Sequence, residues 1–322
     1  MRNFIGFLSA CLVLALVVPP TAARAQHWAP DFGSNFNTVR SILATPEPLM
    51  DLAHIKLAID QMIDPSTDPT VTLKLIEDMV AEVKASVPDN ASNLAKFKAL
   101  RDYLYRPQPL GGKKPFMYDL HDDRNPKAQL LSVYLATRKG NCISMPALFI
   151  ILGQRLDIPV ALTTAPNHFY VKFRGDNGLW YGVETTDGGG WADDQWQLKQ
   201  FPTITPTAIA NGIYLQPLTM RETAAAIAGT LLGSYESLGT VASDLARVQL
   251  AEFLLKHYPK DISAMAHAYF GYLGLKRQLF VERYQRPSDI PANLEPLFED
   301  LENGWLYWGN QATVNGSIPP QA

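Results

Sequence analysis

The sequence predicts an α+β protein in which an apolar helix packs on a small antiparallel sheet, with helical regions before and after it in the chain. Three observations predict this fold class. Apolar residues recur every three or four positions through residues 45–105, and a helical pattern returns after Arg221. Short runs rich in Val, Tyr, Phe and Thr lie between residues 160 and 185. The 322 residues, 47% of them apolar, are enough to bury a sizeable core.

Composition and charge exclude several classes of protein. The chain carries 28 basic and 31 acidic residues, a formal charge of −3. Without a basic excess to neutralise a phosphate backbone, nucleic acid is not an expected partner. The two cysteines exclude a small fold held together by disulfides.

Residues 1–25 have the pattern of a secretory signal peptide. Arg2 precedes an apolar run from Phe4 to Val18, and Ala23 and Ala25 occupy the two positions that a signal peptidase reads. The alternative, a membrane anchor, needs about 20 apolar residues, and this run is shorter. We expect a periplasmic or secreted bacterial protein with no membrane span in the mature chain.

Cys11 leaves a second alternative open. The segment Leu8–Cys11 looks like a lipid-attachment box, but such a box normally closes the apolar region, and here the region continues past it. We therefore expect cleavage after residue 25 rather than lipidation.

The next elements are expected in the following order. Residues 26–40 read as polar and irregular. Helices are expected over 45–60, 70–86, 91–105 and 129–137, and a strongly apolar helix over 144–156. Strands are expected over 160–164, 169–173 and 180–185, with Gly175–Gly178 as a hairpin turn. A linker begins at 202–206, and helices run from 221 to 308, followed by a tail rich in Gly, Pro and Asn.

Cys142, the one cysteine of the expected mature chain, follows the turn Lys139–Asn141. Pro146 lacks an amide hydrogen and belongs in the first turn of a helix, so Cys142 lies at or just before a helix N-terminus. Peptide dipoles there favour a thiolate, and the free amides can hold a developing oxyanion. A buried, inert cysteine and an intermolecular bridge are the alternatives.

His168 and Glu184 are candidates for the base and the orienting acid that a thiolate nucleophile needs. His168 starts one expected strand, and Glu184 lies on the next. If the hairpin forms, both side chains lie near the helix end that carries Cys142. Taken singly, His168 reads as an ordinary strand-end histidine and Glu184 as a solvated strand residue. The three together favour a Cys-His-Glu site.

No cofactor or metal site is expected. The segment His121–Asp123 reads as a solvated loop, because one histidine and two adjacent carboxylates seldom converge on one ion. The segment Gly188–Gly190 lacks the lysine and the helix of a phosphate-binding loop. The remaining histidines have no second ligand type at metal spacing: His27, His54, His257 and His267.

The order of these motifs resembles the bacterial transglutaminase-like core, a papain-related thiol fold, over about residues 115–200. The motifs are Arg138–Cys142, Leu156–Pro159, Asn167–Val171, Gly178–Trp180 and Val183–Thr186. The resemblance implies that Cys142 is the nucleophile, His168 the base and Glu184 the orienting acid. Relatives of this core usually carry aspartate at the third position, and glutamate is one methylene longer.

The expected domains are a transglutaminase-like domain with N-terminal helices at 26–218 and a helical region at 219–322. The helical hairpin at 245–258 and 262–275 is similar to a tetratricopeptide unit, and a plain helical cap is the alternative. The resemblance implies acyl transfer or hydrolysis at an amide or peptide bond of a peptide or protein substrate. The alternative function is a non-catalytic scaffold that recruits a protein partner through the C-terminal helices.

Overall fold

The computed structural model describes residues 30–107, 114–119 and 126–317. Met1–Asp31 form a separate unit, of which only the last two residues are described, and Phe32–Ala322 form one compact unit. The predicted signal peptide, Cys11, His27 and His121–Asp123 therefore lie outside the described residues.

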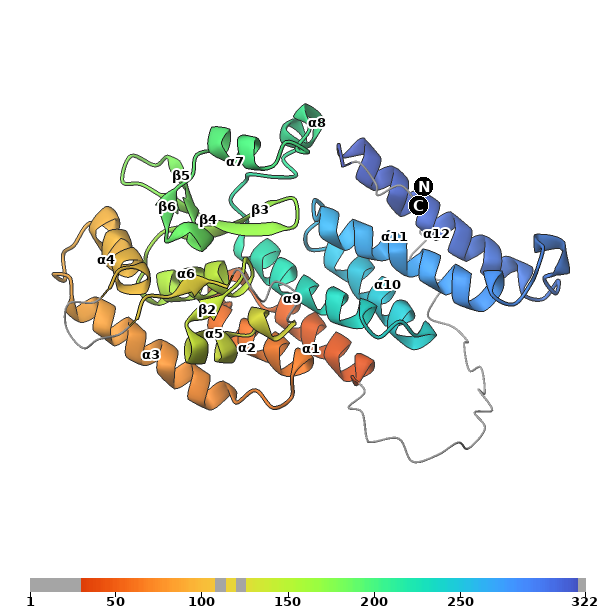
Figure 1. Cartoon of the computed structure of the whole chain (residues 1–322), viewed down its shortest axis with the longest axis horizontal. Coiled ribbons are helices and arrows are strands. Elements are labelled where there is room, and N and C mark those ends of the chain that lie inside the picture. Colours follow the sequence, from red (N-terminus) through yellow and green to blue (C-terminus); the bar gives the residue numbers. More distant parts are fainter. Residues whose placement is uncertain (1–29, 108–113, 120–125, 318–322) are drawn as a thin grey trace. The chain divides into compact units, whose positions relative to one another are not determined.

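Most described residues lie in α-helices, shown in Figure 1. Their bounds are α1 Phe32–Ala44, α2 Leu52–Ile63, α3 Pro69–Ala85, α4 Asn93–Tyr105, α5 Leu131–Thr137, α6 Ser144–Arg155, α7 Asp194–Gln200, α8 Pro206–Ala210, α9 Met220–Glu236, α10 Val241–Leu255, α11 Ile262–Lys276 and α12 Glu295–Val314. Single turns of 3₁₀-helix occur at Glu47–Leu49, Pro126–Gln129, Thr185–Asp187 and Pro287–Asp289, and a π-helical turn at Arg277–Val281.

The strands form two small sheets. Their bounds are β1 Met117–Tyr118, β2 Lys139–Gly140, β3 Val160–Ala165, β4 His168–Arg174, β5 Trp180–Glu184 and β6 Gly190–Trp191. Strands β1 and β2 pair in parallel, and β3-β4-β5-β6 form an antiparallel sheet in that order. The mixed helix and sheet confirms the α+β class.

Helix α6 is the centre of the core. Every residue from Ser144 to Gly153 is buried, because the sheet packs on one side of this helix while α2, α3, α4 and α5 surround the rest (Figure 1). Val171, Phe173 and Val183 belong to the same apolar cluster as α6. Burial on all sides explains why its sequence is apolar throughout rather than along one stripe.

The N-terminal prediction was wrong in one place. Residues 26–40 were expected to be irregular, but α1 begins at Phe32. Its apolar side chains Phe32, Phe36, Val39 and Leu43 follow helical spacing. The Asn, Ser and Thr residues between them mask that periodicity, and packing against α9 and α10 stabilises the helix.

Three boundaries also differ. The helix expected from residue 45 begins at Leu52, because the Asp51 side chain accepts hydrogen bonds from the amides of Ala53 and His54 and caps it there. Met117 and Tyr118, where no element was expected, form β1. The C-terminal helix continues past Trp308 to Val314, since Ala312 is buried and prolongs its packed face.

Helices α9–α12 occupy the C-terminal part, and the described residues between 221 and 308 contain no strand. Helix α9 packs on α1 and α2, while α10, α11 and α12 pack in sequence order. Close helix packing needs glycine at Gly271, where a Cβ atom would lie 2.6 Å from the Val248 side chain.

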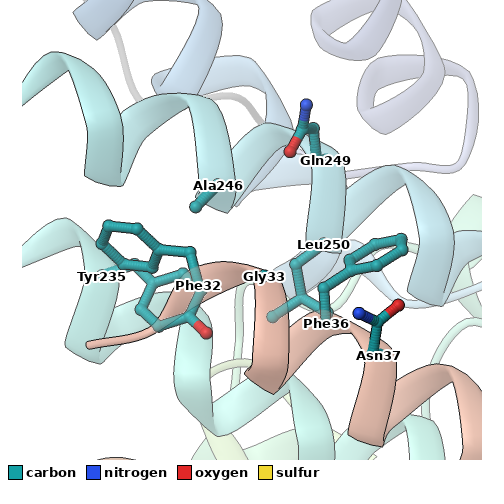
Figure 2. A pocket seen from close by; sticks show the side chains of 8 residues that line it. All are labelled: Phe32, Gly33, Phe36, Asn37, Tyr235, Ala246, Gln249 and Leu250. Carbon is teal, nitrogen blue, oxygen red and sulfur yellow. The ribbon is translucent and has the colours of Figure 1, made fainter. Parts of the chain in front are cut away.

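A pocket of about 210 Å³ lies between α1, α9 and α10 (Figure 2). Phe32 and Tyr235 meet edge to face there with ring centroids 4.8 Å apart, and Asn37 and Gln249 line its polar side. None of the three predicted site residues lines this pocket.

Candidate active site

Cys142 lies in the turn between β2 and α6, two residues before the helix begins. The Asn141 Oδ1 atom accepts hydrogen bonds from the amides of Ile143 (2.9 Å) and Ser144 (3.1 Å). In return, the Asn141 amide donates to Ser144 Oγ at 3.0 Å. This reciprocal cap fixes the start of α6 and places the partly exposed thiol beside the positive end of the helix dipole.

The turn before Cys142 requires a glycine. A Cβ atom on Gly140 would lie 2.5 Å from the Tyr134 ring and 2.6 Å from Ser144 Oγ. Any larger residue would therefore displace the cap that holds the cysteine turn.

A buried ion pair stabilises the chain segment that packs against the cysteine turn. Lys56 and Asp60 on α2 are fully buried and hydrogen-bonded to each other. Lys56 Nζ also donates to the Gln129 carbonyl at 2.9 Å, and Asp60 Oδ2 accepts from the Leu131 amide at 2.9 Å. The adjacent Ala128 carbonyl accepts from Ser144 Oγ at 2.9 Å, which connects the ion pair to the cysteine turn.

This ion pair was not among the features predicted from the sequence. The sequence pattern that could have indicated the pair is a lysine and an aspartate four residues apart within an otherwise apolar helix.

His168 begins β4 after a tight turn in which Asn167 has a φ of 54°. The β4–β5 register pairs Val171 with Val183, so His168 and Glu184 are diagonal neighbours on one face of the sheet. The His168 Nε2 atom lies 2.8 Å from Glu184 Oε2. Since Nε2 is bonded to the carboxylate, Nδ1 is the ring nitrogen left for another partner.

The Cys142 thiol lies close enough to His168 to raise the pKa of its imidazole. The thiol also lies 3.9 Å from the carbonyl oxygen of Asn167, the residue before His168. The thiol of Cys142 therefore lies next to the Asn167–His168 turn, and His168 contacts Glu184.

Burial lowers the pKa of His168, but hydrogen bonds and charge from Cys142 and Glu184 outweigh it and raise the pKa to about 9. Burial raises the pKa of Glu184, but the hydrogen bond and charge of His168 and the hydrogen bonds of Thr186 lower it overall. Both shifts favour a charged pair near neutral pH, in which the imidazolium faces the thiol.

Helix α7 lies over the histidine side of the site. The ring of Phe201, the residue after the helix, lies 5.4 Å from the His168 ring, and the Tyr170 ring stacks on His168 at 6.4 Å. The helix is anchored to the sheet by an ion pair between Lys172, a buried residue of β4, and Asp194 at 2.8 Å. These rings keep the His168 side chain 14% exposed.

The remaining sequence candidates lie elsewhere. His54 pairs with Asp51 at the start of α2, and His267 lies 3.8 Å from Glu236. Trp191 stacks on Phe97 with ring centroids 5.1 Å apart. In the ranges that the structure describes, no three His, Cys, Asp or Glu side chains are grouped to hold a metal ion. No described helix combines the length and apolar character needed to cross a membrane.

Comparison with known proteins identifies the class of the central region. The family model of the transglutaminase-like superfamily matches residues 71–225. This range contains α6, the four-stranded sheet and all three predicted site residues. Residues 71–225 are therefore a transglutaminase-like domain, as the motif order predicted. None of the comparisons confirms the tetratricopeptide-like resemblance of residues 219–322.

Two curated relatives carry the name UPF0162 protein, both from Xylella fastidiosa. The protein of strain 9a5c is 26% identical over 144 residues, 45% of this chain and 48% of the relative. The protein of strain Temecula1 is 27% identical over 132 residues, 41% of this chain and 44% of the relative. The match thus spans about half the length of these curated relatives.

Among solved structures, this chain is similar to menin, with a TM-score of 0.41 and 14% identity. That crystal structure is described as revealing the menin binding site for the Mixed Lineage Leukemia protein. The match covers 88% of this chain and 71% of menin.

Proposed function

We propose that the protein is a thiol enzyme that transfers or hydrolyses an acyl group at an amide or peptide bond, with Cys142 as nucleophile, His168 as base and Glu184 as orienting acid. One observation carries the proposal: the His168 imidazole is hydrogen-bonded to Glu184 Oε2 at 2.8 Å, and the Cys142 thiol lies 3.9 Å from the carbonyl oxygen of Asn167, the residue before His168. A nucleophile, a base and an orienting group in hydrogen-bond sequence are what thiol catalysis requires.

In the proposed reaction, the Cys142 thiolate attacks the amide carbonyl carbon, and its electron pair forms the new carbon–sulfur bond. The carbonyl electrons move to the oxygen, and the positive end of the α6 dipole stabilises that oxyanion. The carbon–nitrogen bond then breaks while the imidazolium of His168 gives its proton to the leaving amine. The product is a thioester on Cys142.

The second half of the reaction releases the acyl group. Water or an acceptor amine loses a proton to the neutral His168 ring and attacks the thioester carbonyl. The carbon–sulfur bond breaks and the thiolate is regenerated beside the imidazolium. Water makes the protein a hydrolase, and an amine makes it an acyltransferase, with a peptide or protein as the acyl donor.

Glutamate in place of the usual aspartate is compatible with this role. The longer side chain spans the diagonal distance between neighbouring strands, and its other oxygen, Oε1, is held by the amide and hydroxyl of Thr186 at 3.0 and 2.6 Å. These hydrogen bonds therefore restrain the longer side chain at its carboxylate end.

Alkylation of the native protein with iodoacetamide across pH tests the proposal. We expect Cys142 to react at lower pH than a free thiol, and His168→Ala to move that profile upward. Cys142→Ser should abolish labelling and leave the thermal midpoint nearly unchanged. A wild-type profile like that of an ordinary thiol would overturn the enzyme proposal in favour of a non-catalytic scaffold with a protein partner.

The proposal also places the protein in the periplasm or outside the cell. This part rests on the sequence pattern of residues 1–25 alone. N-terminal sequencing of the exported protein is expected to begin at Gln26, and recovery of an intact Met1 or of a lipidated Cys11 would contradict it.

A further inference from the structure

Helix α7 carries a polar residue that the proposed triad does not use. Gln197 is fully buried, and its Nε2 atom lies 3.5 Å from Glu184 Oε2. This is the same carboxylate oxygen that bonds His168 Nε2. Gln197 and His168 therefore contact the same oxygen atom of Glu184.

The hydrogen bonds of the Glu184 carboxylate show what Gln197 adds. Oε1 accepts two bonds, from the amide and the hydroxyl of Thr186. Oε2 accepts from His168 and, more weakly, from Gln197. An ionised carboxylate has about four acceptor positions, so Gln197 supplies the fourth donor. With all four used, the carboxylate is fixed in rotation and favoured as an ion.

The orientation of the Gln197 amide follows from this contact. Turning the amide over would place Oε1 against Glu184 Oε2, two acceptors facing each other. In the orientation that donates, Oε1 is buried without a hydrogen-bond partner among the described residues. A buried, unpaired carbonyl destabilises a fold, and an apolar side chain of similar volume would avoid the penalty. Packing alone therefore does not account for a glutamine here.

The same face of α7 also covers the histidine. Phe201 follows Gln197 by four residues, and its amide donates to the Gln197 carbonyl at 2.9 Å. Its ring lies 5.4 Å from the His168 ring. One helical turn thus presents a hydrogen-bond donor to the acid and an apolar surface to the base.

We propose that Gln197 is a positioning residue for the site, which holds Glu184 ionised and oriented toward His168 by donating to Oε2. The inference rests on the proposed function, because it assigns Gln197 a role only through the Glu184–His168 pair. Gln197 does not touch the reacting thiol in this proposal.

Gln197→Met tests the role, because methionine has a similar volume and no donor. We expect the thermal midpoint to stay equal or rise, since an unpaired buried carbonyl is removed. The alkylation rate of Cys142 near pH 6.5 should fall by about 3- to 10-fold, the range expected for one ordinary hydrogen bond, because the contact is long at 3.5 Å. The pH profile should move toward that of an ordinary thiol. Gln200→Met, an exposed position on the same helix, is the matched control.

Gln197→Asn is the second variant, and its result does not depend on how a methionine side chain packs at this position. It keeps the amide and shortens its reach by one methylene, so the same shift in the alkylation profile is expected. The His168 ring signals in NMR give a readout that simple loss of packing would not move. A wild-type alkylation profile and wild-type His168 titration in either folded variant would overturn the positioning role.

The outcomes separate the two proposals. If wild-type Cys142 itself alkylates like a free thiol, the proposed function fails, whatever the variants do. If the wild-type thiol is activated and the Gln197 variants match it, only the positioning role fails.

Discussion

His168 and Glu184 lie on neighbouring antiparallel strands and contact each other diagonally, with His168 Nε2 2.8 Å from Glu184 Oε2. Neither residue is near the other in sequence, and the β4–β5 hairpin brings them together. The contact explains the raised pKa of the histidine and the lowered pKa of the glutamate despite burial that opposes both shifts. It is the relationship that gives Cys142 a charged neighbour.

The first prediction concerns this contact. In Glu184→Gln, the negative charge that supports the imidazolium is lost, so the pKa of His168 should fall from about 9 toward its ordinary value of 6.5. Titration of the His168 ring signals by NMR measures this directly. Glu184→Asp keeps the charge and loses reach, so it should retain part of the raised pKa. Asp187→Asn, on the exposed turn beyond β5, is the control and should leave the titration unchanged.

Enzyme turnover should follow the same order. Thiol nucleophiles depend less on the orienting acid than serine nucleophiles do. We therefore expect Glu184→Gln to lower turnover by about 10- to 1000-fold. Wild-type turnover in both Glu184 variants would remove Glu184 from the triad and make Asp187 the next candidate.

The central part of the fold was predictable because its signals are local. An apolar run starting near Pro146 and ending before Pro159 indicates a buried helix, and Gly175–Gly178 indicates the hairpin that aligns two strands. Within that frame, Cys142, His168 and Glu184 follow from residue type and motif order. In the structure His168 contacts Glu184 and the Cys142 thiol lies beside Asn167, and the catalytic roles of the three residues remain a proposal.

The missed features depend on contacts far apart in the sequence. Helix α1 hides its apolar face among polar residues and is stabilised by α9 and α10. The charges of Lys56 and Asp60 read as surface residues until the tertiary structure buries them. Gln197 carries no motif, and its relation to Glu184 appears only when α7 folds back over the sheet.

The buried ion pair on α2 leads to a stability prediction. In Lys56→Met, the Asp60 carboxylate loses its charged partner inside the core, and unfolding free energy should fall by about 3–5 kcal/mol. The double variant Lys56→Met/Asp60→Leu should recover part of that loss. The loss that remains in the double variant reflects the Gln129 carbonyl and the Leu131 amide, which have lost their hydrogen-bond partners. Denaturant unfolding measures all three.

The exposed pair Lys74–Asp78 on α3 has the same spacing of four residues and is the matched control. Lys74→Met should change stability by no more than about 0.5 kcal/mol. Burial raises the pKa of Asp60 and Lys56 opposes that rise. Without Lys56 the carboxyl protonates more easily, so the deficit should be smaller at pH 5 than at pH 8. Equal losses from Lys56→Met and Lys74→Met would contradict the burial argument.

Asp261 caps α11 through a hydrogen bond from the Ala264 amide at 3.1 Å, yet its burial raises its pKa to about 6. Between the ordinary aspartate pKa of 3.8 and about 6, the folded state binds a proton that the unfolded chain releases. Stability therefore falls as pH rises through this window. The effect of Asp261→Asn on unfolding free energy should be more favourable at pH 8 than at pH 4 by about 2 kcal/mol.

Comparing the two pH values removes any constant effect of the amide on packing. Asp68→Asn, which alters the exposed N-cap of α3, is the control that lacks the burial. If Asp261→Asn behaved like Asp68→Asn in thermal unfolding at both pH values, the buried carboxyl would not be the source of the pH dependence.

The cap on α6 separates the stability of the fold from the reactivity of the thiol. Asn141→Ala removes the acceptor for the Ile143 and Ser144 amides and should destabilise the protein by about 1 kcal/mol. Asn141→Asp keeps the acceptor and adds a negative charge at a helix N-terminus, so stability should hold or rise. The same charge lies one residue from Cys142 and disfavours a thiolate, so alkylation near neutral pH should slow by about fivefold. Stability and thiol reactivity are therefore expected to move in opposite directions in Asn141→Asp. Faster alkylation in this variant would show that the helix start does not set the charge environment of Cys142.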